Sequence, residues 1–178
     1  MPQDPIVQVG EPVLRKVAKP LLPKDISARA TKAIIAKMKR ALAREKYGVA
    51  IAAPQVGSSL RIFVVSGKVF DEEKPAAEHE QETASPARVY INPQITRSSR
   101  KKMEMSEGCL SVRGQYGTVL RHEKVTLKAL GEDGKPILQH ASGLLAHIFQ
   151  HECDHLEGVL FTDKTLELRP WDEHTSDE

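Results

Sequence analysis

The sequence predicts an α+β domain in which a long amphipathic helix is followed by a series of antiparallel strands and then by a second helix. Two observations indicate the helices: apolar residues recur at helical spacing over residues 25–47, and a largely apolar segment fills residues 143–157. A third indicates the strands, because short β-branched segments separated by turn residues occupy much of residues 61–140. Strands grouped between two helices are typical of α+β proteins rather than of alternating α/β folds.

Size and composition predict a single globular domain over residues 1–178. The chain is 40% hydrophobic and 28% charged, with a net charge of +2. So small a net charge argues against a nucleic-acid-binding protein built on a broad basic face. We interpret the basic stretch at 97–102 as a solvated strand edge or loop, and we predict no direct nucleic-acid binding.

Cellular location is predicted from features that the sequence lacks. No apolar run reaches about 18 residues, so no membrane span is expected. The first residues lack the basic start and apolar core of a signal peptide. Cys109 and Cys153 are too few for a disulfide framework and are expected to be reduced thiols in a cytoplasmic protein.

The first half of the chain is predicted to contain one helix and one strand. Proline blocks a long helix in residues 1–24. Asp25 or Ser27 is then the candidate N-cap of the first helix, and Gly48 its end. Residues 61–66 are β-branched and predict a strand.

The stretch at 67–87 is polar and acidic, and we predict a long exposed loop there. Its ends would join neighbouring strands at 61–66 and 88–92. Further strands are expected at 94–106, 117–122, 124–131 and 135–140. Ser142 would cap the second helix and Gly158 would end it. Beyond it we expect a short extended piece at 159–164 and a charged, frayed tail at 165–178.

The second helix contains the pentad HECDH, residues 151–155. His151 and His155 are four residues apart, so both project from one face and can converge on one metal ion, with Glu152 beside them. The helix is apolar around much of its circumference and is expected to be buried, where imidazoles and a carboxylate cost several kcal/mol unless paired or bound to metal. A bare HExxH also occurs without metal, so the pentad alone leaves open a metal site or a polar turn of helix.

A third ligand must come from elsewhere in the chain. His147 and His155 lie about 12 Å apart along the helix axis, too far for both to bind one ion through bonds of about 2.1 Å. We therefore expect His147 to neighbour the site or to be partly exposed. Cys109 is the upstream candidate, although a lone cysteine can equally be a small buried hydrophobe. Cys153 faces away and is expected to pack. The downstream candidates, all weaker, are Asp163, Glu167 and His174.

Three stretches of the chain resemble the three motifs of the peptide deformylase family. They are GVAIAAPQVG at 48–57, EGCLS at 107–111 and QHECDHLEG at 150–158, and their order and spacing match as well. Each motif alone is modestly specific, and all three in order are strongly so. The resemblance implies an α+β fold with antiparallel β-sheets packed around a central HExxH-bearing helix, and a second long helix towards the N-terminus.

The resemblance implies a metal centre with three protein ligands, Cys109, His151 and His155, and one ion per chain. Three ligands and an open position are the arrangement of a catalytic metal. Family members typically use Fe²⁺, with Zn²⁺, Ni²⁺ or Co²⁺ as substitutes. A thiolate favours iron or zinc over magnesium, but the ligand types do not separate these metals further.

The implied reaction removes the N-formyl group from the N-terminal formylmethionine of newly synthesised polypeptides and releases formate. Glu152 would be the general base that takes a proton from the attacking water and later delivers one to the leaving amine. The side-chain amide of Gln55 and the backbone N–H of Leu110 would stabilise the negative charge on the formyl oxygen. The partners implied are N-formylmethionyl peptides and nascent chains near the ribosome, with the enzyme a monomer.

An extended substrate would add as a strand to an exposed sheet edge, and its methionine side chain would enter an apolar pocket. The residues assigned to substrate binding are Gly48, Val49, Ala50, Glu107, Gly108, Leu144 and Ile148.

The chain departs from the family's pattern around the substrate. Ala50 replaces a usual glycine, and alanine would be strained if the backbone had a positive φ at this position. Arg113 replaces a usual proline, Tyr116 stands near a substrate-contacting arginine position, and Leu120 replaces a usual proline before Arg121.

Two alternative functions remain possible on the basis of the sequence alone. One is a HExxH zinc peptidase, which would need a third His or Glu downstream. The other is a catalytically altered, deformylase-like binding protein, which the departures favour. Retention of Glu152 and Gln55 argues against a binding protein, because a binder needs neither a base nor an oxyanion donor.

Overall fold

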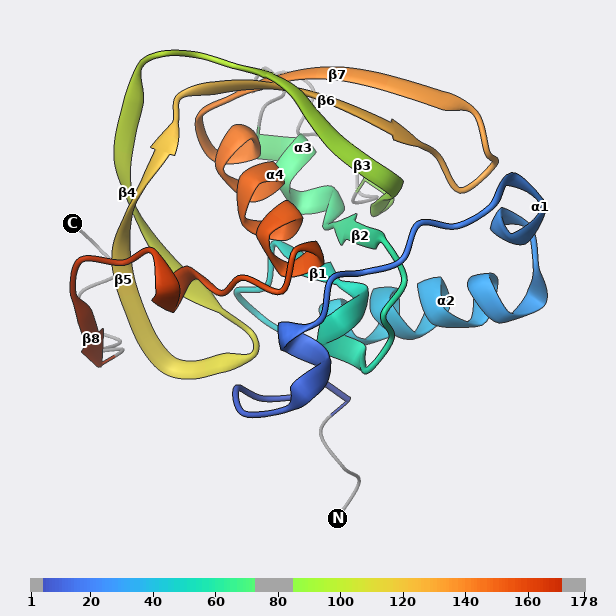
Figure 1. Ribbon diagram of the computed structural model, residues 1–178, viewed down its shortest axis with the longest axis horizontal. Coiled ribbons are helices and arrows are strands. Elements are labelled where there is room, and N and C mark those ends of the chain that lie inside the picture. The colour runs from blue at the N-terminus through green and yellow to red at the C-terminus, as the bar shows by residue number, and fades with distance from the viewer. Residues whose placement is uncertain (1–4, 73–84, 171–178) are drawn as a thin grey trace.

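The computed structural model describes residues 5–72 and 85–170 and shows helices packed with two antiparallel sheets (Figure 1). One sheet has five strands in the order β1-β2-β3-β6-β7, and the other has three in the order β4-β5-β8. Every strand pair is antiparallel. The predicted class, a mixture of helix and antiparallel sheet, is confirmed.

The strands are β1 (Ala50–Ala52), β2 (Ile62–Val65), β3 (Arg88–Ser98), β4 (Lys102–Cys109), β5 (Val112–His122), β6 (Lys124–Leu130), β7 (Pro136–Ser142) and β8 (Leu168–Pro170). The α-helices are α1 (Pro23–Ile26), α2 (Arg29–Ala43), α3 (Gly67–Glu72) and α4 (Gly143–Leu156). The short 3₁₀ helices among the described residues are η1 (Pro12–Arg15), η2 (Ala53–Val56) and η4 (Phe161–Asp163).

Helix α4 lies between the two sheets and contacts strands of both, as well as η2 (Figure 1). Its apolar side is fixed by an aromatic cluster, in which the ring of Phe149 lies 5.9 Å from that of Phe63 and 5.2 Å from that of Tyr90. All three rings are buried, and burial of each is worth about 2–3 kcal/mol. This packing fixes the position of the helix, and with it the position of the polar side chains on its other face.

The predicted first helix is two helices in the structure. Ala28 adopts an extended conformation, with φ −61° and ψ 145°, and this separates α1 from α2. Proline at the start of α1 places Asp25 inside that helix rather than at its cap. Helix α2 buries one apolar stripe and ends at Ala43, ahead of the predicted Gly48, because Arg44 and Glu45 form tighter i→i−3 bonds.

The predicted loop at 67–87 is wrong at its beginning. Residues 67–72 form α3, because Val69 and Phe70 are apolar anchors buried in the core cluster around α4. The guanidinium of Arg88 lies 3.7 Å over the ring of Phe70. Residues 73–84 lie outside the described residues. The flanking strands, β2 and β3, are antiparallel neighbours as predicted.

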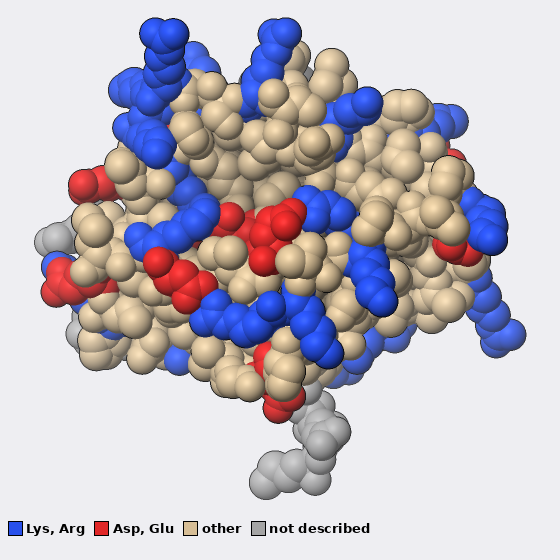
Figure 2. Space-filling view, viewed as in Figure 1, with Lys and Arg blue, Asp and Glu red and all other residues tan. Residues whose placement is uncertain are grey.

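The predicted strand at 94–106 is two strands joined by a turn, since β3 ends at Ser98 and β4 begins at Lys102. Four basic residues around this turn are exposed: Arg97, Arg100, Lys101 and Lys102. Lys and Arg side chains gather along the top of the molecule in Figure 2. This location at a strand end and turn agrees with the strand edge or loop predicted for residues 97–102.

The tail also contains structure that the sequence pattern did not indicate. Leu168–Pro170 is strand β8, which pairs with Gln115, Tyr116 and Gly117 of β5. Gly117 makes this approach possible, because a Cβ there would lie 2.3 Å from Thr165 Oγ1 and 2.7 Å from the carbonyl oxygen of Glu167. Within 159–164, expected to be extended, residues 161–163 form η4. Residues 171–178 lie outside the described residues.

The second helix has the predicted extent. Ser142 is its N-cap residue, although its hydroxyl makes no capping hydrogen bond, and Gly158 follows the end at φ +72°. A side chain at Gly158 would also meet the backbone of Arg15, whose carbonyl oxygen is 2.6 Å from the Cβ position. None of the helices in the described part of the chain is long and apolar enough to cross a membrane.

Candidate active site

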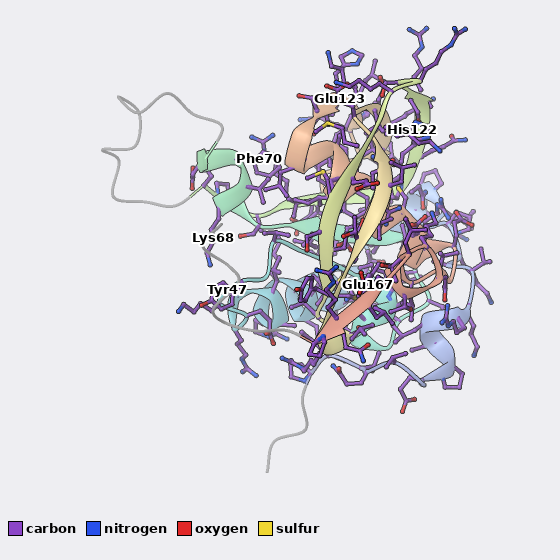
Figure 3. The ribbon with its side chains drawn as sticks, turned by 90° about the vertical axis from the view of Figure 1, so that its left-hand side faces the viewer. Tyr47, Lys68, Phe70, His122, Glu123 and Glu167 are labelled. Atoms are coloured by element: carbon purple, nitrogen blue, oxygen red, sulfur yellow. The ribbon has the colours of Figure 1, made fainter. Side chains whose placement is uncertain are left out.

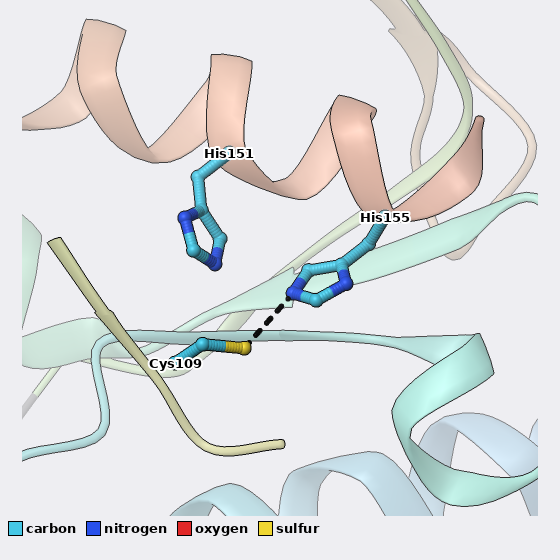
Figure 4. Close-up of side chains that lie close together, drawn as sticks. All are labelled: Cys109, His151 and His155. Atoms are coloured by element: carbon cyan, nitrogen blue, oxygen red, sulfur yellow. Dashed lines mark hydrogen bonds between the residues drawn. The ribbon is translucent and has the colours of Figure 1, made fainter. Parts of the chain in front are cut away.

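Three side chains converge beside α4. Cys109 is the last residue of β4, and His151 and His155 project from consecutive turns of the helix (Figure 4). Their ligand atoms all lie within 4.8 Å of one another, and Cys109 Sγ is 3.2 Å from His155 Nε2. The structure thus brings together the three residues predicted as metal ligands. Cys153 is outside this group and packs against the core, as expected.

The donor set fits a transition-metal ion. A thiolate and two imidazole nitrogens at 2.1–2.3 Å from one ion lie about 3.5 Å from each other, close to the separation of Cys109 and His155. Burial, with the charge of His151, holds the pKa of His155 well below its ordinary value, so its ring is neutral and can bind a metal. These side chains could hold one ion.

Glu107 orients the first of the two histidines. Its Oε2 is 2.7 Å from His151 Nδ1, so a proton on Nδ1 leaves Nε2 facing Cys109 and His155. Burial opposes protonation of His151, but hydrogen bonds with Cys109 and Glu107 outweigh it and raise the pKa of His151 well above its ordinary value.

Glu107 is itself held by a buried network. Arg121 donates to both of its oxygens, at 2.7 and 3.0 Å, and His147 Nε2 lies 2.6 Å from Oε1. Burial would raise the pKa of Glu107, but the hydrogen bonds from His147, His151 and Arg121 outweigh it and hold the pKa well below its usual range. Arg121 also donates to Asp154 of the pentad at 2.5 Å. His147 is thus a buried neighbour of the site, which was one of the two predictions for it.

Glu152 points from α4 into the same region and is 3% exposed. Its Oε2 has no hydrogen-bond partner among the described residues. Burial raises the pKa of Glu152 to about 7, partly offset by the charges of His151 and Arg121. A carboxyl group with this pKa can both accept and release a proton near neutral pH.

Gln55 is placed by the turn after β1. Its Oε1 accepts a hydrogen bond from the Ala52 N–H at 2.8 Å. Its Nε2 donates to Ser111 Oγ at 3.2 Å and lies 3.5 Å from Cys109 Sγ. The amide therefore has one fixed orientation with its N–H groups towards the thiol. Ser111, fully buried, was missed by the sequence reasoning, although it lies inside the EGCLS motif.

A cleft of about 650 Å³ is lined by Gln55, Glu107, Cys109, His151 and Glu152, and we call this buried or half-buried part of the lining its inner end. All seven residues predicted to bind substrate line it, and so does Leu110. Ala50, the questioned position, lies in strand β1, and the non-glycine residue with positive φ among the described residues is Asn92. Alanine is therefore unstrained there. Of the other departures, Arg113 lines the cleft and Tyr116 does not.

The cleft also has lining residues that sequence reasoning missed. Most of them are exposed, and we call this exposed part of the lining the outer end of the cleft. They are Arg44, Glu45, Lys46, Tyr47, Ser106, Val112, Gly114 and Gln115. Most of them are surface residues with no motif of their own, so the sequence contained no signal for them apart from their closeness to the first two motifs. Tyr47 lies at the periphery of the molecule, on the same side as Lys68 (Figure 3).

A buried base next to a cysteine and two imidazoles, on a frame of helices and antiparallel sheets, is typical of metal-dependent hydrolases. Comparison with known proteins identifies the family. The family described as Polypeptide deformylase matches residues 3–171. The chain belongs to this family, which confirms both the resemblance found in the three motifs and the enzyme class, a metal-dependent deformylase.

Individual relatives agree with the family match. The peptide deformylase of Halothermothrix orenii is 42% identical over 168 residues, covering 94% of this chain and 97% of the relative. A peptide deformylase from Synechococcus elongatus in complex with actinonin has a TM-score of 0.75 and 32% identity, covering 94% of this chain and 82% of that one. A Met-Ala-Ser-bound class I type b peptide deformylase from Acinetobacter baumannii has a TM-score of 0.75 and 32% identity, covering 89% and 96%.

Proposed function

We propose that this enzyme removes the formyl group from N-terminal formylmethionine of newly synthesised polypeptides and releases formate, using one metal ion held by Cys109, His151 and His155. The observation that carries the proposal is the convergence of these three side chains within 4.8 Å, with Glu152 and Gln55 beside them in one cleft. The Met-Ala-Ser bound to the Acinetobacter baumannii relative has the sequence of a deformylated N-terminus, which supports the same substrate class here.

The metal would be Fe²⁺, with Zn²⁺, Ni²⁺ or Co²⁺ as substitutes. When bound, such an ion acts as a Lewis acid that lowers the pKa of water and polarises a carbonyl group. Helix α4, between the two sheets, would be the central metal-bearing helix. Glu107 and Arg121 would fix the orientation of His151 through the contacts at 2.7–3.0 Å described above.

Glu152 would move the proton. As a carboxylate it takes a proton from the water that attacks the formyl carbon, and as a carboxylic acid it then gives that proton to the amine nitrogen as the formyl C–N bond breaks. The products are formate and a peptide with a free amino terminus. A pKa of about 7, raised by burial, suits both halves of this transfer.

Gln55 and Leu110 would stabilise the formyl oxygen as negative charge develops on it. The Gln55 amide is already oriented by Ala52 and Ser111, so its N–H groups require no reorganisation during the reaction. Fixed donors of this kind are typically worth about 10²–10³-fold in kcat. The backbone N–H of Leu110 would be the second donor.

The substrate chain would lie in the cleft as an extended strand. Strand β1 is an edge of the five-stranded sheet and β4 an edge of the three-stranded sheet, and residues of both line the cleft. Gly48, Val49 and Ala50 on one side and Gly108 on the other would offer backbone groups to the peptide. The methionine side chain would enter beside Glu107, Leu144 and Ile148.

We further propose that residues 1–178 act as one catalytic domain and as a monomer, that the protein works in the cytoplasm, and that it meets nascent chains near the ribosome. The span of the family match, residues 3–171, supports a single domain.

The test combines metal analysis with an activity assay. Protein purified without oxygen is loaded with Fe²⁺, and formate release from formyl-Met-Ala-Ser is measured, with an unformylated peptide as control. Cys109→Ala should bind less than one tenth of the metal and release no formate. A normal metal content in that variant would remove Cys109 from the site, and cleavage of the unformylated peptide at an internal bond would favour a peptidase instead.

A further inference from the structure

The outer end of the cleft contains charged side chains that the proposed reaction does not use. Arg44, Lys46 and Arg113 line it, together with one carboxylate, that of Glu45. Residues 44–46 directly follow the end of α2, whereas Arg113 is the second residue of β5, just after the turn that joins β5 to β4. Among the described residues, three cations and one anion therefore line this part of the cleft.

The charges further inside do not cancel this excess. Glu107 is neutralised by the bidentate contact with buried Arg121. Glu152 is 3% exposed and therefore lies away from the exposed residues of the outer end. The cation excess at the outer end is thus the charge that an incoming or outgoing part of the peptide would meet.

Glu45 and Arg113 form an ion pair between the two sides of the cleft. Arg113 Nη2 lies 2.9 Å from Glu45 Oε1, and Nη1 lies 3.4 Å from Oε2. Their side chains are 22% and 46% exposed. An ion pair this exposed contributes little to stability, so another carboxylate can replace Glu45 on Arg113 at little net cost.

Lys46 adds a second exposed cation next to an aromatic ring. Its ammonium lies 4.9 Å from the ring centroid of Tyr47, which is 68% exposed. Lys46 is itself exposed to solvent. Arg44 is exposed as well. The outer end of the cleft, its mouth, therefore has exposed cations both on the side of α2 and on the side of the β4–β5 turn.

Substrate geometry places the next residues of the peptide at this mouth. With the formyl group at Cys109 and the methionine beside Leu144, an extended chain advances about 3.3 Å per residue. Residues two to four of the substrate would then pass between Glu45 and Arg113. Side chains alternate along an extended strand, so alternate positions would face the same cation.

We propose that the mouth of the cleft selects formylated peptides with an acidic side chain among the residues that follow methionine, with Arg113 as the principal recognition group and Glu45 as the internal anion that the substrate carboxylate replaces. The proposal rests on the proposed deformylase function and specifies its substrate class. Arg113 is thereby a specificity-determining residue in this chain.

The test uses formyl-Met tetrapeptide amides, whose C-terminal carboxylate is removed so that the substituted residue alone changes the charge. Ala, Glu and Lys are placed in turn at positions two, three and four, and kcat and KM are measured with the metal-loaded enzyme. At low salt, kcat/KM for Glu should exceed that for Lys by about 5–20-fold at one or more positions, because the same exposed cations attract a carboxylate and repel an ammonium group. The difference should lie in KM and should shrink about threefold or more at 0.5 M salt, where screening is strong.

Two variants and one matched control identify the residues responsible. Arg113→Gln should reduce the Glu-to-Lys ratio by at least about threefold, and Glu45→Gln should raise kcat/KM for the Glu peptide by about two- to fivefold, since the Glu45 carboxylate then no longer competes with the substrate for Arg113. Arg15→Gln is the control, because Arg15 makes a similar bidentate pair with Asp163, at 2.5 and 3.1 Å, outside the cleft lining.

The outcomes separate this proposal from the function on which it rests. Turnover of every peptide within twofold, or a Glu-to-Lys ratio that Arg113→Gln leaves unchanged, overturns charge selection and leaves the deformylase function standing. If the metal-loaded enzyme releases no formate from any of the peptides, the proposed function itself fails and this inference with it. Inhibition by the deformylated Met-Glu and Met-Lys peptide amides gives an independent check, because the same preference should appear in their inhibition constants.

Discussion

The inner and outer ends of the cleft each contain an ion pair, and the two pairs differ in their exposure to solvent and therefore in their roles. At the inner end, Glu107 and Arg121 have side chains only 2% and 4% exposed, and both carboxylate oxygens are hydrogen-bonded. At the outer end, Glu45 and Arg113 form a similar pair with 22% and 46% of their side chains exposed. Burial turns the first pair into a fixed support for His151, whereas exposure leaves the second pair exchangeable. We therefore expect substitutions at the inner end to change the rate or the metal affinity by orders of magnitude, and those at the outer end to change the choice of substrate.

The largest difference between the two ends is expected for Glu152→Gln. The amide keeps the shape of the side chain but cannot accept the proton, and loss of a general base lowers kcat by about 10²–10⁴-fold. Metal content should be unchanged, as measured by elemental analysis of the purified variant. Glu157→Gln, an exposed position at the end of the same helix, serves as the control and should keep full activity. Full activity in Glu152→Gln would remove the base assigned here.

Gln55→Leu is the next test of a rigid inner end. The variant removes the oriented N–H groups near Cys109, so kcat should fall by about 10²–10³-fold. KM for formyl-Met-Ala-Ser should change little, because the donors act mainly as charge develops on the formyl oxygen. A rise in KM with kcat unchanged would show that Gln55 binds the ground state instead.

Glu107→Gln tests whether the buried pair supports the metal centre. The variant leaves Arg121 without its anion, so metal affinity should fall by about 10–100-fold and the metal-free protein should lose about 3 kcal/mol of unfolding free energy at pH 7. A competition titration with a coloured chelator measures the first effect, and urea unfolding measures the second. Arg113→Gln, which breaks the exposed pair, should cost less than about 1 kcal/mol.

The pH dependence of stability sharpens the same comparison. The folded-state pKa of Glu107 lies below its ordinary value of 4.5, because hydrogen bonds from His147, His151 and Arg121 outweigh burial. The unfolded chain therefore binds a proton that the folded protein does not bind as the pH falls below about 4.5. The contribution of Glu107 is complete above that pH and is lost below it at up to about 1.4 kcal/mol per pH unit. Urea unfolding of the metal-free protein should thus show the wild-type advantage over Glu107→Gln shrinking from pH 5 to pH 3, and a constant difference would contradict the assignment.

The sequence predicts far more of the residues at the inner end of the cleft than of those at the outer end. His151 and His155 are placed by helical spacing alone, and Cys109 and Gln55 by the motifs in which they occur. Glu107 lies on β4 and its partners lie on β5 and α4, so only the folded structure reveals that Arg121 and His147 meet one carboxylate.

The misses follow from long-range packing that local patterns do not encode. Val69 and Phe70 hold α3 in the core although their neighbours are polar. Strand β8 depends on Gly117, about 50 residues away in the sequence, to admit its backbone. At the outer end, Glu45 and Arg113 are 68 residues apart and belong to no common motif, so their pairing was not predictable.

Ser111→Ala gives the smallest effect and shows how far the rigidity of the inner end extends. Ser111 Oγ accepts a hydrogen bond from Gln55 Nε2 at 3.2 Å, and the same amide keeps its bond from the Ala52 N–H through Oε1. Because one of the two constraints survives, the amide should lose orientation only in part, and kcat should fall by about 3–10-fold, equivalent to about 1 kcal/mol for one neutral hydrogen bond. A loss as large as that of Gln55→Leu would mean that Ser111 alone positions the amide. No loss at all would mean that the Ala52 N–H is a sufficient constraint, and that the rigid part of the cleft ends at Gln55.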